Sequence, residues 1–382
     1  MNINQRIGLY IHIPFCLSKC PYCDFFSIVS HDDELKERYV SALINEIEIY
    51  GRKIKDMELI SIYVGGGTPT VLEGEQLKEI LSSCFYNFSV AEKAEITIEV
   101  NPGTIDGDKI KTIFRAGVNR ISIGGQSFND RVLKKIGRIH SKEDITKTYQ
   151  LARYTGFNNI NVDLMFGLPG LSKREFEKTL KELMMLRPEH ISLYALTIEQ
   201  GTPFYEFIES GKERLPSDDF CSKLFVSAID LFSGNGYEHY EISNFALTGK
   251  RCIHNELYWK NESYLGIGAG ATSYLDNKRY QNYRDLNQYI NLLESGILPI
   301  RYQEILPLKE RMAETIILKL RMMEGLNKGD FRKKFKVPVE KVFHTPLQTL
   351  QEQGLLADNG SNYLLTKKGI LLANNVFTEF LD

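Results

Sequence analysis

Six short runs rich in β-branched and aromatic residues alternate with stretches of helical periodicity in the first half of the chain. Strands that alternate with helices require crossover connections and therefore a mostly parallel sheet. Ser141 and Ser172 stand where helices should begin, and Gly156 where one should end. The sequence thus predicts an α/β fold, a partial parallel (β/α)6 TIM-type barrel, with strands at residues 7–13, 59–64, 95–100, 119–124, 159–165 and 190–196 and helices near residues 33–50, 74–86, 106–116, 141–155 and 172–186.

The character of the sequence changes after residue 235 and again after residue 304. Residues 236–304 are rich in Tyr, Asn and Gly and have weak periodicity, so we expect a linker or extension there. Beyond it come three helical stretches, a hairpin around Asp358-Asn359-Gly360 and a last helix capped by Thr366. The predicted domains are therefore a barrel at 1–235, an extension at 236–304 and a C-terminal α+β winged-helix-like domain at 305–382.

Composition excludes several classes of protein. The formal net charge is -2, and the basic stretch at 327–336 is typical of a solvated helix face, so no nucleic-acid partner is expected. The first residues lack the cationic start and cleavage site of a signal peptide, and no apolar run reaches about 18 residues. We expect a cytoplasmic protein, for which a peripheral membrane contact stays open.

Three of the six cysteines form one tight cluster directly after the first predicted strand. Cys16, Cys20 and Cys23 have the spacing C-x3-C-x2-C, which favours metal binding over a disulfide framework. A structural zinc site needs a fourth protein ligand, for which His12 or His31 is available. Three thiolates instead leave one iron of a [4Fe–4S] cluster open to a chelating ligand.

Polar or glycine-rich motifs also end the other five predicted strands, at the edge where barrel enzymes build their sites. The glycines of GGGTPT (65–70) allow close approach of a ligand to the backbone. Glu99 ends the third strand, and Gln126, Asp163 and Ala195 lie at the ends of the next three. Each polar side chain alone could be a buried and satisfied group. Their coincidence at one edge predicts a ligand site.

The cysteine spacing resembles the signature of the radical S-adenosylmethionine (SAM) superfamily. YIHIPFC, VGGGTPT, EVNP, SIGGQSF and DLMFGLPG are similar to the branch that contains oxygen-independent coproporphyrinogen III dehydrogenase, also called oxidase. The resemblance implies that the three cysteines hold a [4Fe–4S] cluster whose open iron is chelated by SAM, and that an electron donor supports reductive cleavage of SAM. It implies SAM contacts at Tyr10, Gly66, Gly67, Thr68 and Glu99, with further contacts, partly to a second SAM in the dehydrogenase, at Tyr22, Gln126, Arg138, Asp163 and Ala195.

Two departures distinguish this chain from the dehydrogenase. Phe25 stands where the dehydrogenase has a fourth cysteine. The residues His254, Asn255, Tyr258 and Trp259 spell H-N-x-x-Y-W, which resembles the heme-binding motif of the branch's heme chaperones, the HemW type. Histidine is an ordinary axial ligand of heme iron, and Cys252 offers an alternative thiolate. The competing interpretation is a loop histidine with local partners beside a structural aromatic cluster.

These features lead to three hypotheses. The first is a heme chaperone that binds a [4Fe–4S] cluster, SAM and heme and passes heme to acceptor proteins. The second is coproporphyrinogen III dehydrogenation, the oxidative decarboxylation of two propionate side chains. The third is a zinc-stabilised protein whose winged helix binds a partner or nucleic acid.

Overall fold

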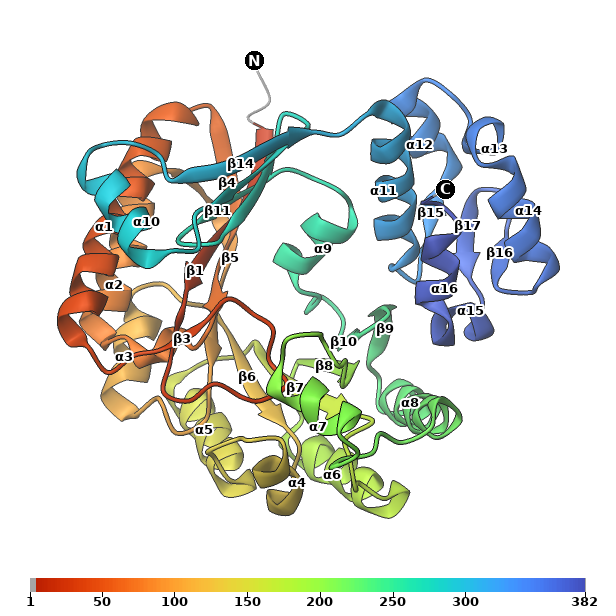
Figure 1. Ribbon diagram of the computed structural model, residues 1–382, viewed down its shortest axis with the longest axis horizontal. Helices are drawn as coiled ribbons and strands as arrows, with labels where there is room; N and C mark the ends of the chain where they lie inside the picture. Colours follow the sequence, from red (N-terminus) through yellow and green to blue (C-terminus); the bar gives the residue numbers. More distant parts are fainter. Residues whose placement is uncertain (1–4, 382) are drawn as a thin grey trace.

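The computed structural model describes residues 5–381, and a twelve-stranded sheet forms its frame (Figure 1). The centre of the sheet is six neighbouring parallel strands: β1 (Gln5–Ile13), β4 (Met57–Gly66), β5 (Ser89–Val100), β6 (Arg120–Gln126), β7 (Ile160–Phe166) and β8 (His190–Ala195). Each contains one of the six predicted runs. The predicted partial parallel barrel is therefore confirmed.

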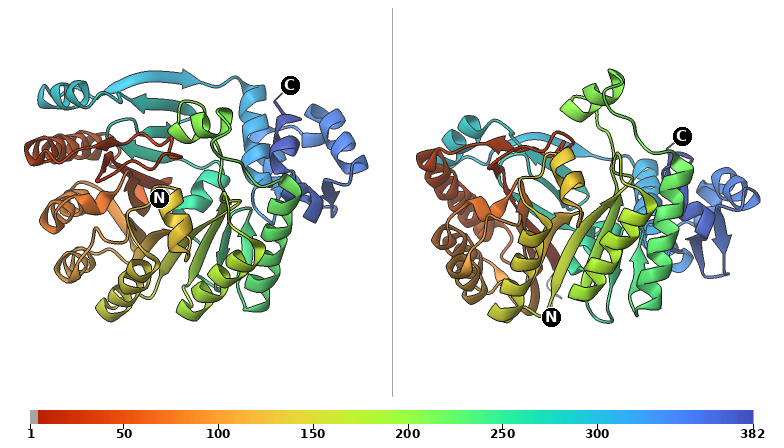
Figure 2. Two further views of the ribbon diagram at one scale, coloured as in Figure 1. Left: turned by 60° about the horizontal axis from the view of Figure 1, so that its bottom comes forward. Right: turned by 90° about the horizontal axis from the view of Figure 1, so that it is seen from below.

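Helices cover the outer side of these strands (Figure 2). Ser141 and Ser172 accept hydrogen bonds from the first turns of α5 and α6 in capping boxes, and Gly156 ends α5 with a left-handed φ of 115°. The predicted helix starts and end are therefore correct. The helices of this layer are α1 (Asp33–Lys53), η1 (Pro69–Val71), α2 (Gly74–Asn87), α3 (Gly107–Arg115), α4 (Asp130–Lys135), α5 (Lys142–Thr155), α6 (Lys173–Leu186), α7 (Pro203–Glu209) and α8 (Asp218–Gly234).

Residues 236–304 extend the sheet at both edges. At one edge β10 (Asn244–Ala246) pairs antiparallel with β8, and β9 (Glu238–Glu241) pairs antiparallel with β10. At the other edge β11 (Tyr264–Ile267) pairs parallel with β1. Three antiparallel strands follow β11: β12 (Thr272–Leu275), β13 (Lys278–Asn282) and β14 (Ile300–Ile305). Two helices, α9 (Ile253–Trp259) and α10 (Leu286–Glu294), complete the segment. The periodicity of this segment is weak because its strands are only three to six residues long.

The C-terminal domain combines short helices with a three-stranded sheet and has its own hydrophobic core (Figure 1). Thr366 caps α15 (Lys367–Leu371) by accepting a hydrogen bond from the Gly369 N–H, so the predicted cap is present. Helix α15 is not the last helix, however, because α16 (Ala373–Thr378) follows it. The domain meets the barrel through backbone hydrogen bonds from Ile242 N–H to the Arg321 carbonyl and from Met323 N–H to the Tyr240 carbonyl. Its elements are α11 (Leu308–Leu320), β15 (Leu326–Asn327), α12 (Lys328–Phe335), α13 (Val339–Val342), α14 (His344–Glu352), β16 (Leu356–Asp358), β17 (Asn362–Leu365), α15 (Lys367–Leu371) and α16 (Ala373–Thr378).

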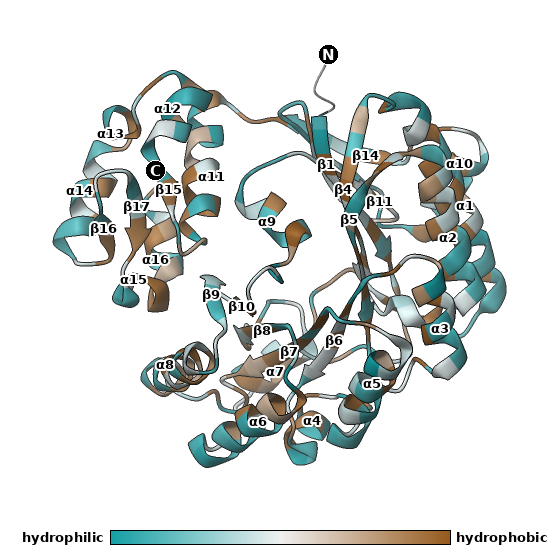
Figure 3. Cartoon of the chain, turned by 180° about the vertical axis from the view of Figure 1, so that it is seen from behind, coloured by the Kyte–Doolittle hydropathy of each residue, from teal (hydrophilic) through white to brown (hydrophobic). Residues whose placement is uncertain are grey.

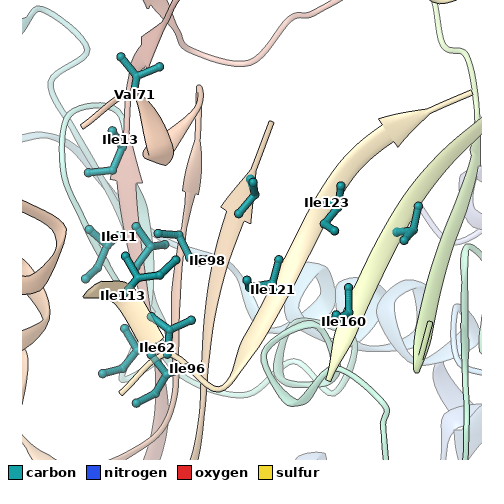
Figure 4. Close-up of a cluster of buried hydrophobic side chains, with 14 of the residues drawn as sticks. Ile11, Ile13, Ile62, Val71, Ile96, Ile98, Ile113, Ile121, Ile123 and Ile160 are labelled. Atoms are coloured by element: carbon teal, nitrogen blue, oxygen red, sulfur yellow. The ribbon is translucent and has the colours of Figure 1, made fainter. Parts of the chain in front are cut away.

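Alternation along the central strands separates a hydrophobic core from a polar interior. Ile62, Ile98 and Ile121 belong to the fully buried layer between the strands and the helices (Figure 4). The outer faces of these helices are mostly hydrophilic (Figure 3). The neighbouring positions Tyr63, Glu99 and Ser122 point to the other face of the sheet and line a cavity. None of the helices within residues 5–381 is long and apolar enough to cross a bilayer.

Candidate functional site

A cavity of about 580 Å³ lies at the C-terminal ends of the parallel strands. This volume is within the range of small-molecule and cofactor sites. Its walls come from the cysteine loop after β1, the ends of β4 to β8, the strands β9 and β10 with the loop between them, helix α9 and Arg321 at the end of α11. The predicted ligand edge of the barrel is thus hollow, and distant segments of the chain enclose it.

The cysteine loop is fixed to the barrel by backbone hydrogen bonds. A short parallel pair, β2 (Phe15–Cys16) and β3 (Ile28–Val29), frames the loop, and Thr68 N–H donates to the Phe15 carbonyl. All three thiols line the cavity, and burial raises the pKa of Cys16 and Cys23. Thiols with a raised pKa need a nearby positive charge, such as that of a metal centre, to bind as thiolates.

The three thiols are a suitable donor set for an iron–sulfur cluster, because thiolates are the protein ligands of such clusters. Thiolates that bind three different irons of a cube stand farther apart than the ligands of one ion. Gly67 makes room beside the loop, because a Cβ there would lie 3.0 Å from the Cys16 sulfur. The donor set and its surroundings therefore fit a [4Fe–4S] cluster.

The two histidines that could supply the fourth ligand of a zinc site, His12 and His31, are not positioned for that role. His12 lies 3.0 Å from the Tyr10 hydroxyl through Nδ1 and 2.9 Å from the Phe26 carbonyl through Nε2. Burial lowers the pKa of His12 to about 4, so the ring is neutral and its proton serves one of these hydrogen bonds. His31 is exposed and follows β3 in the sequence. Neither side chain completes a tetrahedral site with the thiols.

The glycine-rich turn after β4 and the carboxylate of Glu99 form one unit. Glu99 accepts hydrogen bonds from the Tyr63 hydroxyl at 2.9 Å and from the Gly66 N–H at 3.1 Å. Gly66 has a φ of 118°, and a Cβ there would lie 2.6 Å from the His12 ring. Burial raises the pKa of Glu99 to about 7, and the nearby Asp163 carboxylate contributes. A cationic ligand would stabilise the charged form of this carboxylate.

Arg138 connects the cysteine loop to the next strand ends. Its Nη2 donates to Asn101 Oδ1 at 2.9 Å and to the Gly124 carbonyl at 2.8 Å, and its Nη1 lies 3.6 Å from the Cys20 sulfur. Its buried Nε has no partner among the described residues. Arg138 therefore places positive charge beside one thiol and keeps one donor available to a ligand.

Gln126 and Asp163 lie on the floor of the same cavity. Gln126 has a left-handed φ of 65°, and its Oε1 accepts a hydrogen bond from the Tyr194 hydroxyl at 2.8 Å. Such a conformation is uncommon for a residue with a side chain and is found often at functional sites. Asp163 accepts hydrogen bonds from Asn161 and Ser122, and burial raises its pKa.

Helix α9 divides the H-N-x-x-Y-W motif between the cavity and the barrel interior. Asn255 and Trp259 line the cavity. His254 is 1% exposed, and its ring lies 2.9 Å from the Ser61 hydroxyl through Nδ1 and 2.8 Å from the Tyr258 hydroxyl through Nε2. The His254 ring also stacks on Tyr63 at a centroid distance of 5.1 Å. Both ring nitrogens are thus occupied by protein partners.

A buried carboxylate anchors α9 to β5. Glu95 accepts hydrogen bonds from the backbone N–H groups of Ile253 and His254 and from the Cys252 thiol. Arg120 faces the same carboxylate at 3.9 Å, and both side chains are buried. Cys252 is completely buried with a raised pKa, so its thiol lies inside this network and away from the cavity.

The structure brings most of the predicted site residues to one cavity. The residues that line it are Cys16, Cys20, Tyr22, Cys23, Gly66, Gly67, Thr68, Glu99, Gln126, Arg138, Asp163, Asn255 and Trp259. Four predicted residues lie outside its lining. Tyr10, His254 and Tyr258 are packed together beneath it, and Ala195 is exposed at the end of β8. The ligands assigned to all these residues stay predictions.

Sequence reasoning missed other residues of the cavity. Ser122 and Ser192 face it from the middle of β6 and β8, and their signal was a polar residue between two buried isoleucine or leucine positions. Glu241, Asn244 and Arg321 also line it, from segments with no recognisable motif. Their contribution depends on how the C-terminal domain meets the barrel.

Comparisons with known proteins agree with this geometry. The family model described as "Radical SAM superfamily" matches residues 10–183, and that described as "HemN C-terminal domain" matches residues 306–372. The chain is 37% identical to the heme chaperone HemW of Bacillus subtilis (strain 168), covering 97% of this chain and 98% of that protein. It is 34% identical to the heme chaperone HemW of Escherichia coli (strain K12), covering 98% of each. The solved structure of coproporphyrinogen III oxidase (HemN) from Escherichia coli, described as a radical SAM enzyme, matches with a TM-score of 0.86 at 26% identity, covering 99% of this chain and 90% of that one.

The fold and the cavity thus define a radical SAM protein with a C-terminal domain of the HemN type. Membership of this superfamily implies a [4Fe–4S] cluster and SAM as cofactors. Within the superfamily, the chain belongs to the family of the HemW heme chaperones. The resemblance inferred from the motifs is therefore confirmed.

Proposed function

We propose that this protein binds a [4Fe–4S] cluster, SAM and heme and delivers heme to acceptor proteins. Its relatives that carry the name heme chaperone match it over nearly their full length. The observation that carries the proposal is the position of α9. This helix brings Asn255 and Trp259 of the H-N-x-x-Y-W motif into the same cavity as the three cysteines.

The residues around the cluster loop have separable roles in this proposal. Cys16, Cys20 and Cys23 would hold the cluster, which supplies an electron for the cleavage of SAM. The turn at Gly66 and Gly67 lets the backbone approach the ligand closely. A side chain at Gly66 would collide with His12 of β1, and one at Gly67 would collide with the start of the cysteine loop. The carboxylate of Glu99, the guanidinium of Arg138 and the amide of Gln126 supply charge and hydrogen bonds around it.

Asn255 and Trp259 are the motif residues that face a ligand in this conformation. His254 and Tyr258 form a hydrogen bond with each other. The His254 ring packs α9 against Tyr10 of β1 and Tyr63 of β4. Iron ligation by His254 Nε2 would require the loss of its hydrogen bond with Tyr258 and a movement of α9. We therefore propose that His254 supports the heme site in the described state and that Trp259 contacts the macrocycle, as aromatic side chains do well.

A heme titration of the purified, cluster-reconstituted protein under anaerobic conditions tests this function. The wild type should shift the Soret band of added hemin, and Trp259→Ala should weaken binding by roughly tenfold, the typical effect of losing a buried aromatic contact. Tyr154→Ala, an exposed aromatic on α5, is the matched control and should bind like the wild type. Absence of a Soret shift in the wild type would contradict the proposal.

An electron donor and a heme acceptor are the partners that this function requires. The cysteine loop reaches the surface, where Phe25 is 66% exposed and Leu17 is 38% exposed. We propose that an electron donor meets the protein at this loop, because electrons must enter close to the thiols.

Coproporphyrinogen III dehydrogenation is the second candidate, and the close structural match to the HemN enzyme favours it. Phe25 lines the cavity where that branch of enzymes has a fourth cysteine by the motif comparison above, so this chain offers no thiol there. An anaerobic assay with the reconstituted cluster, SAM and coproporphyrinogen III should yield no protoporphyrinogen. Its formation would favour the enzyme over the chaperone.

A further inference from the structure

One wall of the cavity is built where the C-terminal domain meets the barrel. Glu241 ends β9, Asn244 begins β10, Trp259 ends α9 and Arg321 follows α11, and all four line the cavity. Helix α9 lies between the barrel strands and α11 (Figures 1 and 3). Backbone hydrogen bonds join the two segments directly beside this wall, because Ile242 N–H donates to the Arg321 carbonyl.

Each of the four side chains has a buried polar atom without a hydrogen-bond partner among residues 5–381. The unpaired donors are Trp259 Nε1 and Arg321 Nε, and the unpaired acceptors are Glu241 Oε2 and Asn244 Oδ1. Glu241 is 0% exposed and Asn244 is 6% exposed. Buried polar atoms without partners are rare and unfavourable, so four in one cavity wall indicate that a ligand satisfies them.

Arg321 is the least satisfied charge in this wall. Its guanidinium lies over the Trp259 ring at 4.3 Å and 3.7 Å from Glu241 Oε2, which is beyond hydrogen-bond distance. Burial lowers the pKa of Arg321 and raises that of Glu241. Each charge has lost its hydration, and the attraction between the two charges compensates for that loss only in part. Glu241 is held by Asn244 and by the Ser243 N–H through its other oxygen.

Arg138, the other arginine of the cavity, has more hydrogen-bond partners than Arg321. Arg138 donates to Asn101, Gly124 and Cys20, so two of its three nitrogens are already bound. Within the described chain, the guanidinium of Arg321 donates no hydrogen bond of its own. A guanidinium with free donors beside an indole N–H suits a carboxylate, which accepts several hydrogen bonds in one plane.

We propose that Arg321 and Trp259 form a carboxylate subsite that holds a propionate side chain of the tetrapyrrole in the cavity. This inference rests on the proposed function, since it takes heme as the ligand. It assigns the C-terminal domain a direct part in ligand binding through Arg321. The subsite exists only while that domain is docked on β9, so ligand binding and docking stabilise each other.

The test compares hemin with hemin dimethyl ester, whose propionates are esterified, in one detergent buffer. The wild type should bind hemin roughly tenfold or more tightly than the ester, the usual effect of a charge-assisted hydrogen-bond pair. Arg321→Gln should bind the two ligands equally, with the affinity for the ester unchanged. Arg332→Gln, an exposed arginine on α12 of the same domain, is the control and should behave as wild type.

The outcomes separate this inference from the function on which it rests. A wild type that binds neither ligand overturns both. A wild type that binds hemin and the ester equally overturns the subsite and leaves the heme chaperone intact. An Arg321→Gln variant that loses both ligands to the same extent shows a structural role for the arginine and also overturns the subsite.

Glu241→Gln gives an independent check on the sign of the ligand's charge. Removing the Glu241 charge leaves Arg321 without a competing anion, so the affinity for hemin should rise while that for the ester stays constant. Weaker hemin binding in Glu241→Gln would show that the ligand presents a cation or a donor to Glu241 and would overturn the carboxylate assignment. Iron content and circular dichroism of each variant show that the fold is intact.

Discussion

Glu99 is the titratable residue that best reports on ligand binding. Its pKa is raised to about 7 because it is buried and lies near Asp163. A cationic ligand such as SAM favours the deprotonated carboxylate, so binding must displace a proton when the pH is below about 7.

The affinity for SAM should therefore fall as the pH decreases through about 7. Glu99→Gln should bind SAM roughly tenfold more weakly above pH 7, because a charge-assisted hydrogen bond is lost, and should lack this component of the pH dependence. Isothermal titration of SAM into reconstituted protein at several pH values measures both effects. Equal pH profiles for the wild type and Glu99→Gln would contradict the role of this carboxylate.

Gly67 is the residue whose replacement should most directly affect the cluster. A Cβ at this position would lie 2.7 Å from the Phe15 carbonyl and 3.0 Å from the Cys16 sulfur. Gly67→Ala should displace the cysteine loop and reduce the iron and sulfide content after reconstitution to less than about half of the wild-type value. Gly107→Ala, at the start of α3 with no contact closer than 4.0 Å, should retain its full content. Normal iron in Gly67→Ala would show that the loop adapts.

The sequence predicts the position and contacts of some residues and not of others. The spacing of the three cysteines is a local pattern that the sequence shows directly. The position of Arg321 beside Glu241, without a direct hydrogen bond between them, follows no local pattern, because the two residues are distant in the sequence. The motif that predicted His254 as a heme-site residue likewise gave no sign of its hydrogen bond with Ser61, which is distant in the sequence.

At the scale of elements, a buried carboxyl group ties α1 to the loop after β11, to the end of β13 and to α10. Glu46 accepts hydrogen bonds from the Gly268 N–H, the Asn282 amide and the Tyr289 hydroxyl, and it is fully buried. Burial raises its pKa from 4.5 to about 7, so the folded state favours the protonated form. The stabilising contribution of that proton is complete below about pH 4.5 and is lost as the pH rises through about 7.

The free energy of unfolding should therefore carry a Glu46 component that decreases by about 3 kcal/mol between pH 4.5 and a pH above 7. Glu46→Gln has no charge to gain, so the difference in unfolding free energy between it and the wild type should change by that amount over the same range. Urea denaturation at several pH values measures it. A difference that stays constant with pH would contradict the raised pKa.

Elements also differ in predictability. The six central strands and the helices between them were predictable because each is long enough to show its period. Helix α9 has seven residues and rests on Glu95, which belongs to a strand far away in the sequence. Its position depends on that tertiary contact, so the motif residues were recognisable and the helix that carries them was not.

At the scale of the whole molecule, Met322 marks the junction between the barrel and the C-terminal domain. It is 0% exposed and packs with Tyr240 and Ala246, with Trp259 against them. Met322→Asp would bury an unpaired charge there and should destabilise the docked state by more than about 3 kcal/mol.

The docking interface should then open while the cluster loop stays intact, because the three cysteines belong to the other side of the cavity. Hydrogen exchange should become faster in β9 and at the end of α11, and hemin should bind more weakly, while the iron content stays at the wild-type value. Met323→Asp, at a position that is only partly buried, is the milder comparison. Unchanged exchange in β9 for Met322→Asp would contradict the importance of this junction.

The overall architecture was predictable only as far as local signals reach. The parallel barrel and the order of the C-terminal elements follow from periodicity and turn residues. The extension of the sheet to twelve strands does not, since β9 to β13 contain only three to five residues each and join the barrel through two long-range pairings, of β10 with β8 and of β11 with β1. Long-range pairing of short strands leaves almost no trace in a single sequence.

The place of β1 in the sheet has a consequence for biosynthesis. β1 lies between β4 and β11, so Gly8 pairs with Ser61 on one side and with Tyr264 on the other. During translation β1 therefore keeps one unpaired edge until β11 leaves the ribosome, after all the other parallel strands. The bracing of the cysteine loop from that side, in which the Tyr39 hydroxyl joins the His12 carbonyl to the Ala269 N–H, is completed equally late. The cysteine loop is thus among the first segments to be synthesised and among the last to gain its full support.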